Sequence, residues 1–128
     1  WISHFQSKNG DIVASEKPLS MDDIFLQKVG EIVQANLSDE NFTVEKLGRT
    51  LRLDRTQLFR KLKALTGENP SHFIRTTRLK IAYQLLENQT ATVAEIAFQV
   101  GFSNPSYFSR SFKQYFGKTP GEVRNNKT

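Results

Sequence analysis

The chain has 128 residues, a formal net charge of +5 at pH 7, 38% hydrophobic residues and no cysteine. This length is typical of one domain with a modest core, and the absence of cysteine excludes a disulfide scaffold, a thiolate metal site and a cysteine nucleophile. No apolar run approaches the roughly 20 residues of a membrane helix, and no signal peptide opens the chain, so we expect no membrane contact.

Residues 1–20 mix Ser, Lys, Gly, Asp and Pro without a clear hydrophobic period, which predicts a linker or tail. Because the first residue is Trp1 rather than Met, we expect the chain to belong to a longer protein. From residue 21 apolar residues recur every three and four positions, which predicts a helix that ends at the polar run 36–41. Ser20 and Asp23 are the expected capping pair of this helix.

Six further helices are predicted, over residues 44–51, 55–65, 70–87, 93–100, 106–116 and about 120–126. Most of them follow a side chain that can cap the first free backbone N–H groups, namely Thr43, Asp54 with Gln57, Thr92 with Glu95, Asn104, and Thr119 with Glu122. Gly67 and Gly117 stand where a left-handed residue usually ends a helix. Strand signals are nearly absent, so the predicted fold class is all-α.

The charge is divided unevenly along the chain. Residues 1–41 contain three lysines and seven acidic residues, a net of −4, whereas residues 42–128 contain fifteen basic and six acidic residues, a net of +9. A basic block of this size is typical of a surface that binds a polyanion such as nucleic acid. Charge alone is equally compatible with a merely solvated surface.

Two segments of the basic block resemble each other. Val44, Leu47 and Leu51 match Val93, Ile96 and Val100 at an offset of 49, while Leu58, Arg60, Leu62, Lys63, Gly67 and Pro70 match Phe108, Arg110, Phe112, Lys113, Gly117 and Pro120 at an offset of 50. Each copy is a short helix, a turn and a second helix, which is the helix-turn-helix pattern. Small residues, Gly48 and Ala97, occupy equivalent positions where the two helices of a unit must pack closely.

The expected architecture is therefore two helix-turn-helix subdomains, about seven helices in all, joined by a long central helix. The expected bounds are 1–20 for the tail and 21–128 for the domain, with units at about 43–66 and 93–116, a linker helix at 70–88 and a closing helix at 120–126. The 18 residues from Pro70 to about Glu87 span roughly 27 Å as a helix, which could hold two reading helices about one DNA turn, roughly 34 Å, apart.

Residues 93–124, VAEIAFQVGFSNPSYFSRSFKQYFGKTPGEVR, carry the most specific motif. With the first copy they make the stretch from about Ser38 to Asn125 resemble the DNA-binding domain of the AraC/XylS family of transcription regulators. Residues 23–47 and 55–80 also resemble the C-terminal output domain of Bacteroidetes-type hybrid two-component systems. The resemblance implies binding to double-stranded promoter DNA, with RNA polymerase and upstream receiver and kinase domains as partners and with no cofactor. It implies a cytoplasmic location, at the cytoplasmic end of a membrane-anchored chain if the protein is a hybrid sensor. We expect this part alone to be monomeric and the full-length protein to be dimeric.

In the family, base-reading side chains come from the N-terminal half of each second helix. Carried over by position, they are Arg55, Thr56, Gln57, Phe59 and Arg60 in the first unit and Asn104, Pro105, Ser106, Ser109 and Arg110 in the second. Arginine can pair with guanine and glutamine with adenine, although the capping role competes for Gln57. Phe59 either contacts a thymine methyl or packs against the protein, and Arg110 either reads a base or pairs with Glu95.

Phosphate contacts are expected from basic residues that surround the two units, namely Arg52, Lys63, Arg75, Arg78, Lys113 and Lys118. The apolar positions predicted to form the core are Leu47, Leu51, Leu58, Leu62, Phe73, Leu79, Leu85, Ile96, Val100, Phe108, Phe112, Tyr115 and Phe116. The second base-reading set is short and weakly charged, so the first unit should carry most of the sequence discrimination. Because no Lys or Arg occurs from Ile81 to Ser109, the basic footprint should be strongest at the first unit.

Catalysis is not expected. His4 lies in the tail and His72 has no second histidine or cysteine near it in the sequence, so neither metal binding nor a catalytic triad is indicated. The alternative to DNA binding is a helical protein-interaction module whose basic face meets an acidic partner domain.

Overall fold

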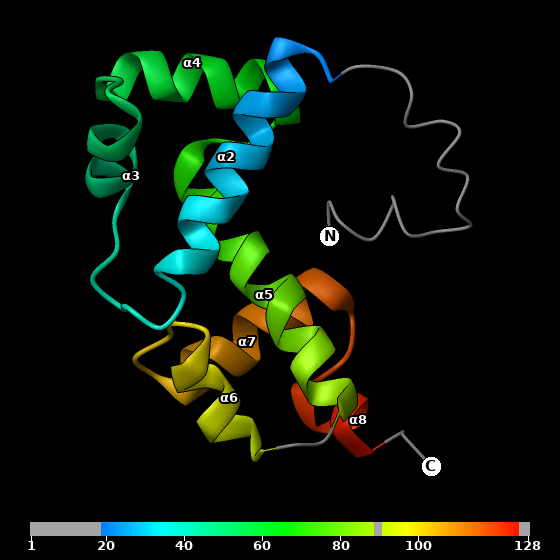
Figure 1. The fold of residues 1–128 in the computed structure, drawn as a ribbon. Coiled ribbons are helices and arrows are strands. Elements are labelled where there is room, and N and C mark those ends of the chain that lie inside the picture. The colour runs from blue at the N-terminus through cyan, green and yellow to red at the C-terminus, as the bar shows by residue number, and fades with distance from the viewer. Residues whose placement is uncertain (1–18, 89–90, 126–128) are drawn as a thin grey trace.

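The computed structural model describes residues 19–88 and 91–125, and over these residues the chain forms seven helices and no strand (Figure 1). The helices are α2 (Met21–Ala35), α3 (Val44–Leu51), α4 (Arg55–Thr66), α5 (Pro70–Asn88), α6 (Val93–Gln99), α7 (Pro105–Phe116) and α8 (Pro120–Asn125). The predicted all-α class is confirmed. The expected tail up to residue 18 and the last position of the closing helix lie outside the described residues.

The predicted caps position the helix ends. Thr92 Oγ1 accepts a hydrogen bond from the Glu95 amide at 3.1 Å, and Glu95 Oε1 accepts one from the Thr92 amide at 2.9 Å. Thr119 and Glu122 repeat this arrangement, as do Ser20 with Asp23 and Asp54 with Gln57. These backbone hydrogen bonds stabilise the carboxylate form and lower the pKa of Glu95 and of Glu122. Local sequence signals therefore set most helix boundaries.

Helix α5 is shared by two groups of helices. Helices α2, α3 and α4 gather around its N-terminal half, and α6, α7 and α8 gather around its C-terminal half (Figure 1). The first core includes Phe73 and Ile74 of α5, whereas the second includes Leu79 and Leu86. Because one rigid helix contributes side chains to both cores, the two helix-turn-helix units share a common support.

Most of the predicted core positions are buried, including Leu47, Leu58, Leu62, Phe73, Leu79, Ile96, Val100, Phe108 and Phe112. Leu51, Leu85 and Phe116 are half-buried at the edges of the cores. The prediction for Tyr115 is wrong, because its side chain remains 41% exposed. It lies on the flank of α7 that faces α5 across a cleft, where its ring packs on Phe116.

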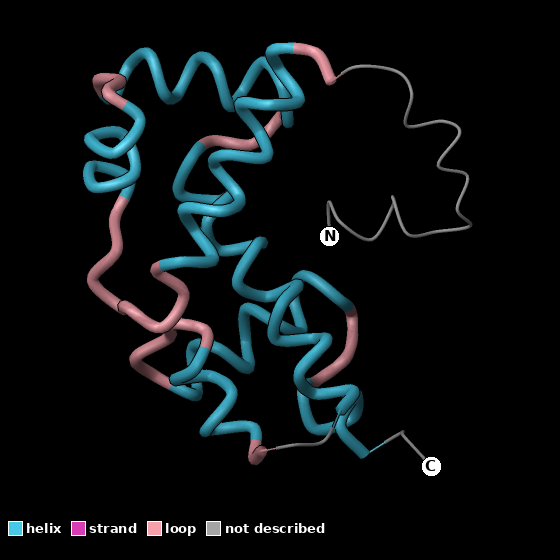
Figure 2. Tube along the Cα trace, viewed as in Figure 1, coloured by secondary structure: helices cyan, strands magenta, loops and turns pink. Residues whose placement is uncertain are grey.

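The prediction of a phosphate contact for Arg78 is also wrong. This residue is only 6% exposed, and its guanidinium points into the protein. Nη1 donates to the Gly101 carbonyl at 2.7 Å, and Nη2 donates to the Asp39 carbonyl at 3.0 Å. Asp39 lies in the loop between α2 and α3, and Gly101 lies in the turn between α6 and α7, two segments that meet beside α5 (Figure 2). Arg78 therefore ties the loop that precedes the first unit to the turn of the second unit.

Burial lowers the pKa of Arg78, and the charge of Asp39 partly opposes this effect. The side chain nevertheless stays protonated at neutral pH, because the pKa of arginine is far above 7. Its Nε is buried and has no hydrogen-bond partner among the described residues. The two carbonyl oxygens are thus the main compensation for removing this charge from water.

Gly101 is the residue on which this contact depends. Its φ is +92°, a backbone conformation that side chains disfavour, and a Cβ atom there would lie 2.1 Å from Arg78 Nη1 and 2.3 Å from the Leu37 carbonyl oxygen. Neither neighbour can move freely, since one is a buried hydrogen-bonded group and the other is backbone. Only glycine fits at this position.

We therefore predict a difference between two glycine-to-alanine variants. Gly67 also has a positive φ, of +80°, but a Cβ there would have no neighbour within 4 Å. Gly67→Ala should lower the free energy of unfolding by about 1 kcal/mol, from backbone strain alone. Gly101→Ala should lower it by about 3 kcal/mol or more, because it also displaces a buried hydrogen-bonded charge. Urea denaturation followed by circular dichroism measures both, and equal losses would contradict the fit described for Gly101.

Candidate nucleic-acid interface

The two helix-turn-helix units have the same backbone framework. In the first, the Leu53 amide donates to the Gly48 carbonyl at 2.9 Å, and in the second, the Phe102 amide donates to the Ala97 carbonyl at 2.9 Å. A Cβ on Gly48 would lie 2.8 Å from the Leu53 carbonyl oxygen, so close packing in this turn requires a small residue, as predicted. The left-handed residue of the turn is Arg52 in the first unit, with φ +61°, and Gly101 in the second.

Helix α4 presents a polar face to solvent. Leu58 and Leu62 are buried on its inner side, and all five residues predicted to read bases in the first unit are exposed: Arg55, Thr56, Gln57, Phe59 and Arg60. Phe59 is 46% exposed, so it is not a core residue and its ring is available for an apolar contact. The N-terminal half of α4 therefore has the composition and exposure expected of a recognition helix.

Two of these α4 side chains already have protein partners. Gln57 Oε1 accepts from the Asp54 amide at 3.0 Å, so the capping role engages its carbonyl oxygen. Arg55 forms an ion pair with Glu45 of α3, with both side chains largely exposed. An exposed ion pair of this kind is worth little in water and can be exchanged for a phosphate or a base. Arg60 has no such partner among the described residues, so its guanidinium is more available for a new contact than that of Arg55.

Helix α7 presents a shorter polar face. Asn104 Oδ1 accepts from the amides of Ser106 and Tyr107 at 2.8 and 3.2 Å, which makes it the N-cap of the helix. Pro105 and Ser109 are half-buried, whereas Ser106 and Arg110 are exposed. The suggested pairing of Arg110 with Glu95 does not form, because Glu95 is engaged with Thr92 and feels the charge of Arg124 instead. Arg110 is therefore free to face a ligand.

Basic residues surround the two exposed faces. Arg52, Lys63, Lys113 and Lys118 are exposed, and the Lys118 ammonium lies 5.8 Å from the centre of the Tyr83 ring. Arg75 is half-buried, and its Nη2 donates to His72 Nδ1 at 3.1 Å. Of the six predicted phosphate contacts, Arg78 alone points inward. The sequence analysis did not single out the polar flank of α7 formed by Tyr107, Ser111 and Gln114, which faces Arg75 across a cleft.

The comparisons with known proteins agree with this geometry. Residues 47–126 match a family described as "Helix-turn-helix domain", and solved AraC-type DNA-binding domains share the fold. The chain belongs to the AraC-type helix-turn-helix family. Curated relatives of the chain include transcription regulators, such as the HTH-type transcriptional regulator MtrA of Neisseria gonorrhoeae. The AraC-type fold contains two helix-turn-helix units. In this chain their second helices are α4 and α7, and the long helix α5 supports both units.

One relative of this AraC-type domain is histidine kinase P4 of Formosa agariphila, 42% identical over 106 residues that make up 83% of this chain and 8% of the kinase. The C-terminal domain of AraT, a response regulator of Geobacillus stearothermophilus, is 26% identical with a TM-score of 0.74, covering 88% of this chain and 90% of that one. The DNA-binding domain of AdpA, solved in complex with a target DNA, is 29% identical with a TM-score of 0.72, covering 79% and 90%.

The AraC-type domain spans less than half the length of the curated relatives that it matches, such as 40% of the Msm operon regulatory protein of Streptococcus mutans. Among residues 19–88 and 91–125, no helix combines the length and apolar character required to cross a membrane. Within the same residues, no three histidine, aspartate or glutamate side chains are grouped closely enough to hold a metal ion.

Proposed function

We propose that this chain binds double-stranded DNA sequence-specifically and regulates transcription, with α4 and α7 entering successive major-groove segments on one face of the duplex. The observation that carries the proposal is the pair of exposed polar faces on the second helices of two matched units, held on one support. Helix α5 has 19 residues and is therefore about 28 Å long, close to the roughly 34 Å of one DNA turn.

The residues assigned to base reading are those of the exposed α4 face, with Arg60 foremost, and Ser106, Ser109 and Arg110 of α7. Asn104 and Pro105 shape the start of α7 and bring it close to the groove. Exposed Arg52, Lys63, Lys113 and Lys118, together with Arg75, serve as phosphate contacts. The DNA-binding domain comprises residues 21–128, and its two helix-turn-helix units lie at about 43–66 and 93–116.

The relatives support a role for this domain within a longer protein. A histidine kinase and a response regulator carry domains similar to this one, which supports an output role downstream of receiver and kinase domains. Recruitment of RNA polymerase, with activation as the regulatory outcome, and dimerisation through other domains complete the proposal. The regulator acts in the cytoplasm, at the inner end of a membrane-anchored chain if the protein is a hybrid sensor.

Selection of bound duplexes from a random library, followed by sequencing, tests the proposal directly. We expect enrichment of two short motifs whose centres lie about one helical turn apart. Fluorescence anisotropy then compares the selected duplex with a scrambled one at about 50 mM salt, where phosphate contacts are strong. Equal binding of all sequences, or no binding, would count against DNA recognition and favour a basic module that docks on an acidic protein.

Arg60→Ala should reduce affinity for the selected duplex by about 1–3 kcal/mol and relax the base preference at one position. The physical reason is the loss of a two-pronged contact from an exposed guanidinium that has no protein partner. Competition with duplexes carrying each of the four base pairs at every position measures the preference. If Arg60→Ala weakened binding to all sequences equally, Arg60 would be a phosphate contact and not a base reader.

Lys113→Ala should weaken binding to selected and scrambled duplexes alike. It should also make the log–log dependence of affinity on salt less steep by about one, because one fewer phosphate is neutralised. Titrations at several salt concentrations provide the slope. Lys28→Gln on α2 removes an exposed charge outside the basic block and should leave the slope unchanged. A change in base preference for Lys113→Ala would contradict its assignment to the backbone.

Arg78→Met should alter how binding depends on the separation of the two motifs. The wild type, whose units are tied by Arg78, should lose affinity sharply when one base pair is inserted between the motifs. The variant should bind the original duplex about tenfold more weakly, a change of about 1.4 kcal/mol, and lose much less on insertion, because its units can adjust. A matched variant, Arg49→Met, replaces an exposed arginine of α3 and should keep the sharp penalty.

A further inference from the structure

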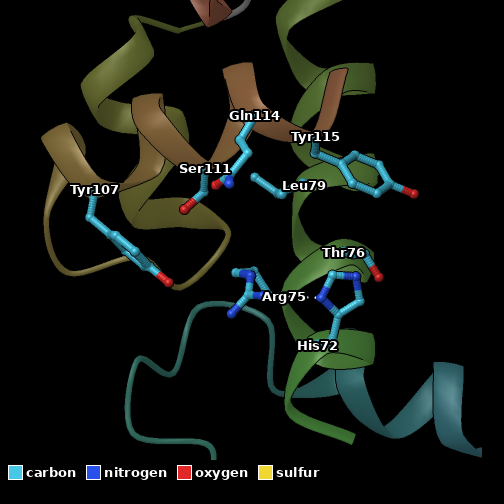
Figure 3. A pocket seen from close by; sticks show the side chains of 8 residues that line it. All are labelled: His72, Arg75, Thr76, Leu79, Tyr107, Ser111, Gln114 and Tyr115. Carbon is cyan, nitrogen blue, oxygen red and sulfur yellow. Dashed lines mark hydrogen bonds between the residues drawn. The ribbon is translucent and has the colours of Figure 1, made fainter. Parts of the chain in front are cut away.

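A cleft of about 360 Å³ lies between the first half of α5 and one flank of α7 (Figure 3). The polar side chains that line it include His72, Arg75 and Thr76 from α5 and Tyr107, Ser111 and Gln114 from α7. The α7 residues follow one another at intervals of four and three, so they share a flank of the helix. This flank adjoins the exposed face that carries Ser106 and Arg110.

The cleft combines one positive charge with several neutral hydrogen-bond donors. Arginine has no acceptor, so in its contact with Arg75 the His72 Nδ1 atom must be the acceptor. The other ring nitrogen, Nε2, lies 3.5 Å from Glu68 Oε2. Glu68 Oε1 accepts a hydrogen bond from the Thr76 hydroxyl at 3.4 Å. Glu68 is not one of the residues that line the cleft. The remaining N–H groups of Arg75 have no hydrogen-bond partner among the described residues.

The polar groups of the α7 side chains in this cleft are also available as hydrogen-bond donors. The Tyr107 hydroxyl, the Ser111 hydroxyl and the Gln114 amide make no hydrogen bond to another described residue. Figure 3 shows Tyr107, Ser111 and Gln114 directed from α7 toward the space in front of Arg75. None of the described residues that line the cleft carries a carboxylate. Three neutral polar groups and a guanidinium thus converge on a space that is suited to an oxyanion.

We infer that this cleft binds a backbone phosphate of the DNA, in the stretch that separates the two major-groove segments. The inference rests on the proposed function. Between two successive major-groove segments on one face of a duplex, the phosphate strands on either side of the minor groove face the protein. The cleft joins the half of α5 that packs with the first unit to a flank of α7 in the second, so a phosphate held there would lie between the two units.

The assignment also gives each group a defined task. The Arg75 guanidinium supplies the charge and a planar pair of donors, while the Tyr107 and Ser111 hydroxyls and the Gln114 amide supply neutral hydrogen bonds of the kind that fix protein register on the duplex. The contact to His72 holds Arg75 in place before DNA arrives. Arg75 is thus a positioning contact rather than a base reader, and it sets how α7 sits relative to α4 on the DNA.

The test replaces single phosphates of the selected duplex by neutral methylphosphonates, one position at a time between the two motifs. For the wild type, one position should reduce affinity about tenfold, as expected for the loss of a charged hydrogen-bonded contact of about 1.4 kcal/mol. Arg75→Gln should bind the unmodified duplex about tenfold more weakly and be insensitive to that one replacement. Tyr107→Phe, which keeps the ring packed on Phe102, should show a smaller loss coupled to the same phosphate.

Lys28→Gln is the charge-matched control and should keep the full sensitivity of the wild type. A phosphate profile of Arg75→Gln and Tyr107→Phe that equals the wild-type profile would overturn the inference. Circular dichroism tests whether each variant is folded. If Arg75→Gln does not fold, the phosphate profile of Tyr107→Phe still tests the inference. Failure to select any duplex with the wild type would refute the proposed function instead, so the two failures are distinguishable.

Discussion

The guanidinium of Arg78 joins the loop that precedes the first helix-turn-helix unit to the turn of the second unit. Removing a charge from water is costly, and here two backbone carbonyls, from Asp39 and Gly101, provide the compensation. One carbonyl lies in the loop that leads into the first unit and the other in the turn of the second unit, so neither segment can move away without leaving the buried charge poorly solvated. The packing of both cores along α5 orients the units, and Arg78 restricts the remaining freedom between them. A reader of two DNA segments needs this restriction, because a flexible joint would not define the distance between α4 and α7.

The same contact explains why the two copies of the repeat differ at one position. The left-handed turn residue is Arg52 in the first unit and Gly101 in the second, 49 residues later. Arg52 is exposed, so its side chain extends into solvent, and its cost is limited to backbone strain. Gly101 lies beneath Arg78 and against the Leu37 carbonyl, where no side chain fits. The same turn backbone therefore has two roles. In the first unit it is open to solvent, and in the second unit it packs against Arg78.

Arg75 and Arg78 are three residues apart on one helix and have opposite surroundings. Arg78 is buried between the units, whereas Arg75 lines an open cleft beside the second reading helix. The cleft matters because no lysine or arginine occurs from Ile81 to Ser109, so much of the second unit has little charge of its own. A phosphate held by Arg75 and the polar flank of α7 would anchor that unit from the side. The first unit, with Arg60 exposed on α4, would then provide most of the base discrimination.

The sequence by itself determined the helices, most of their caps, the repeat and the family, because these depend on hydrogen bonds and hydrophobic periods within a few residues. It also identified the exposed face of α4 and the principal core positions. Only the tertiary structure decided the role of Arg78, whose partners lie 23 and 39 residues away, and the exposure of Tyr115. It likewise decided between the two interpretations of Arg110, because Glu95 forms the predicted cap with Thr92 and no pair with Arg110. A basic side chain on a helix looks the same in sequence whether it faces solvent or a neighbouring unit, and only the packing of distant segments distinguishes the two.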